Sequence, residues 1–205
     1  NKGSISGIKF FGGELAVPMQ LRMSIVHALG QPYACLPDYK VYLDAGHGPG
    51  DGGASGCGYL EDDLTKDLAR RVGEILVNDY GIAVYVHDSG GSYKYRMPEA
   101  VQLGCSSLVS FHFNAGGGTG SESYIHSYYA AANSPYFQGE IHPYMINGVG
   151  LTDRGMKADE FAVVNGSIPA VLLEICFIDN WNDMSHYLEN KEYVAQQIAA
   201  GIAQA

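Results

Sequence analysis

The stretch LDAGHGPGDGGASGCGYLEDDLT, residues 43–65, decides the fold of this chain. It begins at the end of a β-branched, apolar run that predicts a strand over residues 39–43. A glycine-dense loop carrying His47 follows, and from Glu61 apolar residues recur at helical spacing until Gly81, a typical helix-ending glycine. Acidic residues crowd this predicted helix start, where the helix dipole favours negative charge. The loop therefore brings an imidazole and a carboxylate together from two packed elements, which is how metal sites are built.

The composition fits a single globular domain. With 205 residues, 46% of them apolar, the chain is long enough for a sizeable core. No run approaches the roughly 18 apolar residues of a transmembrane helix, and no signal peptide is visible. The net charge of −10 argues against nucleic-acid binding and against attraction to anionic membranes, because both call for basic patches. Sparse charges with abundant Gly, Ser and Tyr are more usual in proteins outside cells.

The cysteines do not form a metal-binding pattern. There are four of them without a CxxC pair, which argues against a cysteine-only zinc site. Their spacing leaves open whether they form disulfides or remain buried thiols. They are Cys35, Cys57, Cys105 and Cys176.

Strands alternate with helices from residue 39 onward. Residues 1–38 contain short apolar runs broken by Gly and Pro, and one candidate helix at 19–29. We interpret these residues as an N-terminal extension or linker remnant that packs on the main domain. Further strands are predicted at 82–87, 107–113, 122–129, 161–164 and 169–177, and helices at 95–103, 135–149 and 191–203. This alternation predicts an α/β fold with a mostly parallel sheet of about six strands, flanked by helices on both faces.

Four polar residues fall where such a sheet places its ligands. His47 follows the first strand and His112 ends the third, and the carboxyl ends of strands are where open α/β sheets bind ligands. With Glu61 they make two histidines and a carboxylate, the ligand set of many catalytic zinc sites. Glu174 stands on an otherwise apolar strand, where a charge is costly unless paired. Burial would raise its pKa toward the range useful to a general base.

Each residue also has a purely structural interpretation. A histidine after a strand is more often structural than a ligand, Glu61 could serve only the helix dipole, and Glu174 could pair with a buried cation. The glycine loop lacks the GK[ST] ending of a phosphate-binding loop. The other histidines have no partner at telling spacing, and we interpret them as structural: His27, His87, His126, His142 and His186.

The sequence resembles the zinc-dependent N-acetylmuramoyl-L-alanine amidases of the type-3 amidase family. LDAGHGPGDGGASG resembles the family's DPGHGG-D-GA-G opening, and GYLEDDLTKDLARRV resembles its GL-E-DLTL-A-RL helix. SLVSFHFNA resembles the SIHANA strand, and TDRGMKADEFAVVNGSIPAVLLEICFIDN resembles the RG-K-----VL----PAVLVELGFLSN close. The likeness runs in order from residue 39 to the C-terminus.

The resemblance implies a zinc amidase catalytic domain over residues 39–205, with a twisted mixed sheet and flanking helices. It places the ligands of one Zn²⁺ on His47, Glu61 and His112 and the catalytic glutamate on Glu174. Arg96 and Asn114 are implied to support the substrate or the structure.

The implied reaction is hydrolysis of the amide between N-acetylmuramic acid and L-alanine in peptidoglycan, with Glu174 taking a proton from zinc-activated water. We therefore expect a monomer without membrane insertion, acting in the extracellular space, cell wall or periplasm. Delivery as a phage lysin also fits, and the sequence does not choose between endolysin, autolysin and sporulation or division enzyme.

Two alternatives remain at this stage. A zinc carboxypeptidase-like peptidase acting on wall or other peptides would use the same ligands, but it needs a cation for a terminal carboxylate, for which Arg96 and Arg154 are the candidates. A non-catalytic wall-binding module would tolerate loss of Glu174 or of a ligand. All four residues are present, which argues against such a module.

Overall fold

The computed structural model describes residues 9–11, 14–16 and 39–205. The first two segments pair as a short antiparallel hairpin, β1 (Lys9–Phe11) with β2 (Glu14–Ala16). The helix predicted at residues 19–29 lies outside the described residues. The interpretation of residues 1–38 as an extension that packs on the main domain therefore stays a prediction.

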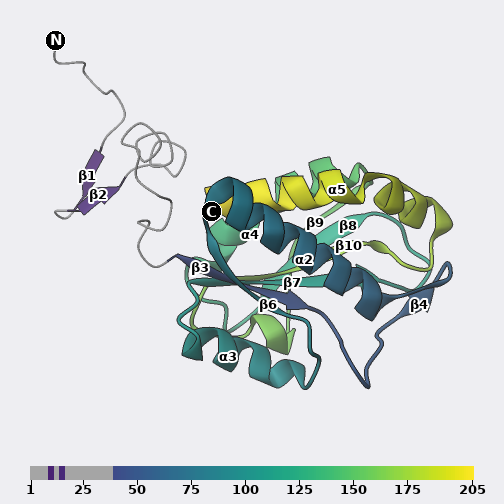
Figure 1. The fold of residues 1–205 in the computed structure, drawn as a ribbon, viewed down its shortest axis with the longest axis horizontal. Helices are drawn as coiled ribbons and strands as arrows, with labels where there is room; N and C mark the ends of the chain where they lie inside the picture. The colour runs from purple at the N-terminus through teal and green to yellow at the C-terminus, as the bar shows by residue number, and fades with distance from the viewer. Residues whose placement is uncertain (1–8, 12–13, 17–38) are drawn as a thin grey trace, which may run out of the picture.

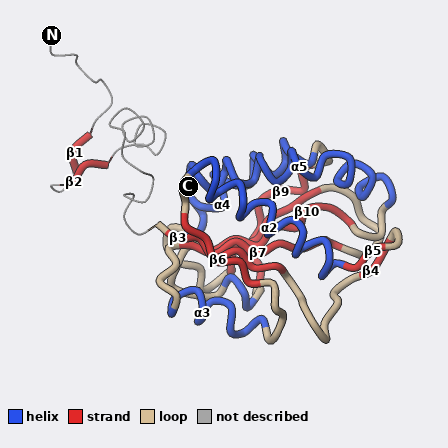
Figure 2. Tube along the Cα trace, in the orientation of Figure 1, coloured by secondary structure: helices blue, strands red, loops and turns tan. Residues whose placement is uncertain are grey.

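One six-stranded sheet forms the centre of the domain (Figures 1 and 2). Its order is β6-β3-β7-β10-β8-β9, and every neighbouring pair is parallel except β10 with β8. The prediction of a mostly parallel, mixed α/β sheet is confirmed. The strands are β3 (Lys40–Ala45), β6 (Ala83–His87), β7 (Ser107–Asn114), β8 (Ser121–His126), β9 (Asp153–Asp159) and β10 (Ala170–Phe177).

Helices cover both faces of the sheet, as predicted. On one face lie α2 (Glu61–Tyr80), α4 (Ser134–Val149) and α5 (Trp181–Gln204), and on the other lies α3 (Arg96–Gln102) with the short helices η2 (Tyr93–Tyr95) and η3 (Ala162–Val164) (Figure 1). The central strands are buried from both sides, so they read as continuous apolar runs. Alternate residues of β3 serve the two layers: Leu43 packs under α2 in the larger core, and Tyr42 in the smaller core beside α3.

Three details of the predicted fold are wrong. Of the residues 161–164 predicted as a strand, 162–164 form η3, because Val163 and Val164 fill the smaller core against α3 instead of pairing with the sheet. The sixth strand is β9, whose polar sequence DRGMKAD gives no strand signal because it lies exposed at the sheet edge. The closing helix also starts at Trp181, earlier than residue 191, where Asn180 caps it with its side chain.

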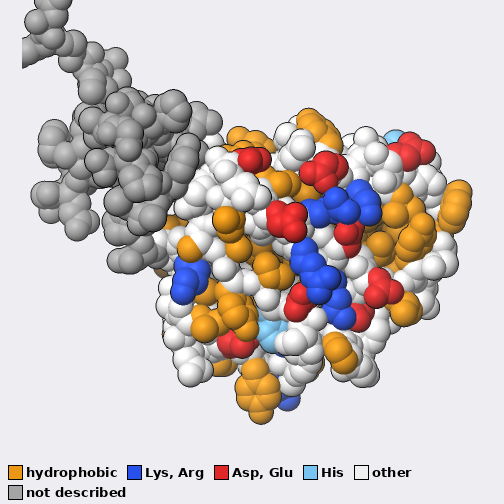
Figure 3. Space-filling view, viewed as in Figure 1, with side chains coloured by type: hydrophobic (Ala, Val, Ile, Leu, Met, Phe, Trp, Pro, Cys, Tyr) orange, Lys and Arg blue, Asp and Glu red, His pale blue; other side chains and the backbone are white. Residues whose placement is uncertain are grey.

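Basic side chains on the outer helices are paired with acids. Lys66, Arg70 and Arg71 of α2 bind carboxylates on α2 itself, on the loop after β6 and on α5. On the face drawn in Figure 3, blue and red side chains accordingly lie side by side. Within the described part of the chain, no helix combines the length and apolar character needed to cross a membrane. Cys57, Cys105 and Cys176 are free thiols.

Asp183 in the first turn of α5 should be a strong contributor to stability. It is fully buried, and its carboxylate accepts hydrogen bonds from Thr119 Oγ1 (2.6 Å) and from the N–H groups of Gly120 (2.9 Å) and Phe177 (3.1 Å). Asp183→Ala would leave two buried backbone donors unpaired, and we expect urea unfolding to show a loss of about 3–5 kcal/mol. The control Asp88→Ala breaks only the exposed pair with Arg70 and should cost less than about 1 kcal/mol. Equal losses would contradict this interpretation.

Candidate metal centre

Glycines let the loop after β3 pass close to charged side chains. His47 itself lies in the left-handed region, with φ 69°. A Cβ on Gly46 would stand 2.5 Å from the His112 ring, and one on Gly53 would stand 2.6 Å from the Glu61 carboxylate. Side chains at either glycine would therefore displace the residues predicted to bind metal.

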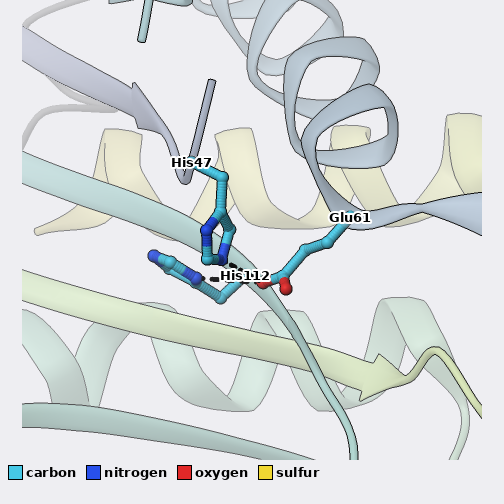
Figure 4. A group of neighbouring side chains, drawn as sticks. All are labelled: His47, Glu61 and His112. Carbon is cyan, nitrogen blue, oxygen red and sulfur yellow. Dashed lines mark hydrogen bonds and ion pairs between the residues drawn. The ribbon is translucent and has the colours of Figure 1, made fainter. Parts of the chain in front are cut away.

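Glu61 is the point on which both histidines converge (Figure 4). Its Oε1 lies 3.1 Å from His47 Nε2 and 3.0 Å from His112 Nδ1. The buried carboxylate is also fixed by backbone, because the N–H of Phe113 donates to Oε1 (3.0 Å) and that of Ala54 to Oε2 (2.8 Å). The three predicted ligands, from a loop, a helix start and a strand, are thus brought together by the fold.

The electrostatics of this cluster favour a bound cation. The hydrogen bond to Glu61 raises the pKa of His47 to about 9. Burial alone would raise the pKa of Glu61, but the hydrogen bonds from His112 and His47 outweigh it and hold that pKa well below its usual value. A proton here occupies the space between nitrogen and oxygen that a metal ion would take, so protons and metal compete for the same atoms.

The donor set fits a divalent metal such as zinc. One ligand atom from each of His47, Glu61 and His112 lies within 4.8 Å of the others, which one ion can bridge with modest adjustment. The second nitrogen of His47 lies 3.2 Å from Asp51 Oδ1. Metal-binding histidines characteristically use their other ring nitrogen this way, since a carboxylate partner fixes the ring orientation.

Glu174 lies beside this cluster without a partner of its own. On β10 it is in register with His112 of β7 on one side and Glu122 of β8 on the other. Its Oε2 is sealed from solvent and has no hydrogen-bond partner among the described residues. Burial raises the pKa of Glu174 to about 7, with His112 opposing the rise and the charges of Glu61 and Glu122 adding to it. The alternative of a structural ion pair is therefore not observed in the described part of the chain.

Glu174 separates two pockets. The first, of about 310 Å³, holds His47 and His112 and has an aromatic wall of Tyr93 and Phe161. The second, of about 420 Å³, extends past Glu174 over the β7–β8 loop. It is lined by Asn114, Ala115, Gly116, Gly117, Gly118, Glu122, Tyr124, Arg154, Phe161, Glu174 and Phe177.

Arg96 supports the backbone of His47. It is only 3% exposed, and its Nε donates to Asp44 Oδ1 (2.7 Å), a carboxylate that also accepts from Ser110 Oγ (2.6 Å). The remaining guanidinium nitrogens donate to the carbonyl oxygens of Gly90 (2.7 Å) and His47 (3.3 Å). With its charge neutralised by Asp44, Arg96 has the position of a structural support.

Asn114 meets a residue that the sequence analysis did not single out. Its Nδ2 donates to Oε1 of the buried Glu122 (2.7 Å), whose Oε2 pairs with Arg154 (2.8 Å) and with Lys157. The sequence offers one signal for Glu122: a carboxylate falls at a buried position of a strand with an alternating sequence pattern.

Three of the remaining histidines have other partners. His87 contacts Glu99 and the Gly90 carbonyl, and His142 contacts Ser123 and Asp153. His126 accepts hydrogen bonds from two backbone N–H groups in the following turn. His27 lies outside the described residues.

The family model described as N-acetylmuramoyl-L-alanine amidase matches residues 41–204. The chain belongs to this family. The sporulation-specific N-acetylmuramoyl-L-alanine amidase of Bacillus subtilis (strain 168) is 37% identical over 169 residues, covering 80% of this chain and 65% of the relative. The endolysin of Bacillus phage SPP1 is 37% identical over 176 residues, with the same 80% and 65% coverage. The chain thus spans slightly less than two thirds of these relatives.

Solved amidase structures share the fold. The catalytic domain of CwlV, an N-acetylmuramoyl-L-alanine amidase from Bacillus (Paenibacillus) polymyxa var. colistinus, is 32% identical with a TM-score of 0.72, covering 80% of this chain and 96% of that one. The N-acetylmuramoyl-L-alanine amidase of Clostridium difficile 630 is 28% identical with the same TM-score, covering 81% and 93%. The α/β architecture of this amidase-family chain is therefore that of a catalytic domain.

The raised pKa of Glu174 predicts a pH-dependent effect of Glu174→Gln on stability. In metal-free protein, Glu174 is protonated in both folded and unfolded chains below about pH 4.5. As the pH rises to about 7, the unfolded chain ionises first, so wild type loses stability that the neutral glutamine retains. The stability difference, variant minus wild type, should grow by about 2–3 kcal/mol between pH 5 and pH 8. Urea unfolding of chelator-treated protein measures it, and a difference independent of pH would contradict the raised pKa.

Proposed function

We propose that this chain hydrolyses the amide bond between N-acetylmuramic acid and L-alanine in peptidoglycan. The observation that carries the proposal is the half-buried carboxylate of Glu174 beside the cluster of His47, Glu61 and His112, whose Oε2 has no hydrogen-bond partner among the described residues. Family membership over residues 41–204 supports the choice of reaction. Such a carboxylate destabilises the fold when ionised, which is a cost that a catalytic role explains.

We propose further that His47, Glu61 and His112 hold one Zn²⁺. Two imidazoles and a carboxylate suit zinc and leave a coordination position open. When bound, zinc would supply a Lewis acid for the amide carbonyl and lower the pKa of a coordinated water toward about 7. The backbone N–H groups that hold Glu61 keep this ligand in place before metal arrives.

Glu174 would carry the proton through the reaction. With a pKa near 7, its Oε2 can accept a proton from the attacking water and later return it to the departing amine of L-alanine. The register of Glu174 with His112 supports this role, because it sets Glu174 beside one of the three proposed ligands. Tyr93 and Phe161 form an apolar wall of the same pocket, against which a sugar ring could pack.

The substrate and site of action follow from this reaction. Peptidoglycan lies outside the cytoplasm, so we propose that the domain acts in the extracellular space, the cell wall or the periplasm, and as a monomer. Among its relatives are a sporulation-specific amidase and a phage endolysin, and the shared catalytic domain fits either setting. Residues 39–205 would be the catalytic unit.

A carboxypeptidase-like reaction is the second candidate, and only Arg154 supports it. Arg96 is buried against Asp44 and has no charge to spare for a substrate. Arg154 does line the second pocket, so a terminal carboxylate could in principle bind there. The position of the cleaved bond distinguishes the two reactions.

Zinc content tests the proposed ligands. Purified wild-type protein should contain close to one zinc per chain by plasma mass spectrometry, and His112→Ala should lose most of it, because two ligands hold zinc much more weakly than three. The matched control is His186→Ala on the exposed side of α5, which should keep its zinc. A folded His112→Ala variant with full zinc would exclude the proposed site.

Turnover tests the proposed base. Glu174→Gln keeps the shape of the side chain but cannot accept a proton, so we expect release of alanine amino termini from peptidoglycan to fall by roughly 10²–10⁴-fold. Zinc content should remain at the wild-type level. Glu160→Gln makes the same change at an exposed residue lining the same pocket and should retain most of the activity. A zinc-loaded Glu174→Gln variant with wild-type turnover would rule out the mechanism.

A further inference from the structure

We propose that Arg154 forms a carboxylate-binding subsite in the second pocket, which selects substrates with a free carboxylate on the second residue of the peptide stem. The inference rests on the proposed amidase function, because that function places the departing peptide beside Glu174. It assigns this pocket a ligand chemistry and makes Arg154 a specificity-determining residue.

Two cations share one buried carboxylate at the edge of the second pocket. Glu122 is a single buried carboxylate, yet Arg154 Nε (2.8 Å) and Lys157 Nζ both pair with its Oε2. Its Oε1 accepts from Asn114 Nδ2 (2.7 Å) and the Tyr124 hydroxyl (3.0 Å). The buried carboxylate is thus fully hydrogen-bonded, and two cations share one negative charge. The two cations exceed the charge of Glu122 by one, and Glu174 in the wall of the same pocket offsets this excess when it is ionised.

The guanidinium group of Arg154 is placed to bind a carboxylate. Its side chain is 36% exposed and lies over the Phe177 ring, 4.9 Å from the ring centroid. Of the five guanidinium N–H groups, one donates to Glu122 and one to the Thr119 carbonyl (3.3 Å). The other three have no partner within the described residues. A guanidinium held by stacking and by Glu122 loses little entropy when it binds a planar anion.

The two pockets differ in the charge they offer. The metal pocket is bordered by the carboxylates of Asp51 and Glu160, which would repel an anionic group. The second pocket also contains two carboxylates, Glu122 and Glu174, but Glu122 is already paired, and the wall adds Arg154 and the glycine loop 116–118. Two of these glycines donate their N–H groups to Asp179 Oδ2 (2.8 and 2.9 Å), which fixes the loop in the pocket wall.

The direction of the substrate follows from the role of Glu174. Because its carboxyl returns a proton to the departing amine, the peptide leaves on the side of Glu174, and this side chain lines both pockets. A peptide that extends from Glu174 away from the metal pocket enters the second pocket, whose wall includes Arg154. The second stem residue is either D-isoglutamate, with a free carboxylate, or its carboxamide, D-isoglutamine. Arg154 would favour the former.

Two matched substrates test the subsite. Both are N-acetylmuramoyl-L-alanyl peptides, with D-isoglutamate or D-isoglutamine as the second residue and the γ-carboxyl capped as an amide, so that they differ by one charge. Wild-type protein should cleave the carboxylate substrate with about 10- to 100-fold higher kcat/KM, mainly through KM, as expected for a charge-assisted hydrogen bond. Arg154→Met should reduce this ratio to within about threefold, and Arg154→Lys should restore part of it, because lysine keeps the charge but not the fork.

Arg71→Met is the control for loss of an arginine. Arg71 also donates to two acceptors, on Asp67 and Glu192, but on the outer surface of α2 and α5. This variant should keep the wild-type substrate ratio. A wild-type ratio near one, or a ratio that survives Arg154→Met, would overturn the proposal.

Calorimetry with the two released peptides separates this inference from the proposed function. The peptide with D-isoglutamate should bind zinc-loaded wild-type protein at least about tenfold more tightly than the peptide with D-isoglutamine, and Arg154→Met should remove the difference. If neither muramoyl substrate is cleaved but the Arg154-dependent preference in binding holds, the amidase function fails and the subsite stands. If both substrates are cleaved equally and both peptides bind equally, the amidase function stands and the subsite is wrong.

Discussion

The carboxylate of Glu61 is the constraint on which the rest of the site depends. It accepts from backbone N–H groups on the glycine loop and on β7 while both histidine rings converge on it. Loop, helix and strand are therefore held together at one buried group whose desolvation is offset by four donors. The glycines before and within the loop are required because any side chain at Gly46 or Gly53 would collide with the converging residues. Arg96 and Asp44 complete the arrangement by fixing the backbone of His47.

The register of the sheet strands places Glu174 next to this cluster. Because β10 pairs with β7 on one side and β8 on the other, Glu174 stands in one row with His112 and Glu122. Three acidic or basic groups in adjacent strands would ordinarily be paired, yet Glu122 satisfies its own charge with Arg154 and Lys157 and leaves Glu174 alone. The ion pairs of Glu122 thus leave the Glu174 carboxyl without a cation among the described residues. The same ion pairs place a cation, Arg154, at the second pocket.

Much of this could be predicted from the sequence, and the exceptions have physical causes. The first strand, the helix from Glu61 to Tyr80 and its end at Gly81 follow from local patterns that the structure confirms. The strand predicted at 161–164 was wrong because its apolar residues fill a core instead of a sheet, and β9 was missed because an exposed edge strand needs no apolar side chains. Glu122 and Arg154 could not be paired in advance, since their contact depends on how β8 and β9 are placed in the sheet. The three predicted metal ligands could be found because His47 follows, Glu61 begins and His112 lies at the end of a strongly patterned element.

The most direct test of the central claim is the position of oxygen incorporation during digestion of peptidoglycan in ¹⁸O-labelled water. If Glu174 and the His47–Glu61–His112 cluster hydrolyse the muramoyl amide, mass spectrometry should find one ¹⁸O atom in the lactyl carboxylate of muramic acid. The released peptides should then begin with an unlabelled L-alanine bearing a free amine. Label in a carboxylate of the peptide, with the muramoyl amide intact, would contradict the account and indicate a peptidase instead.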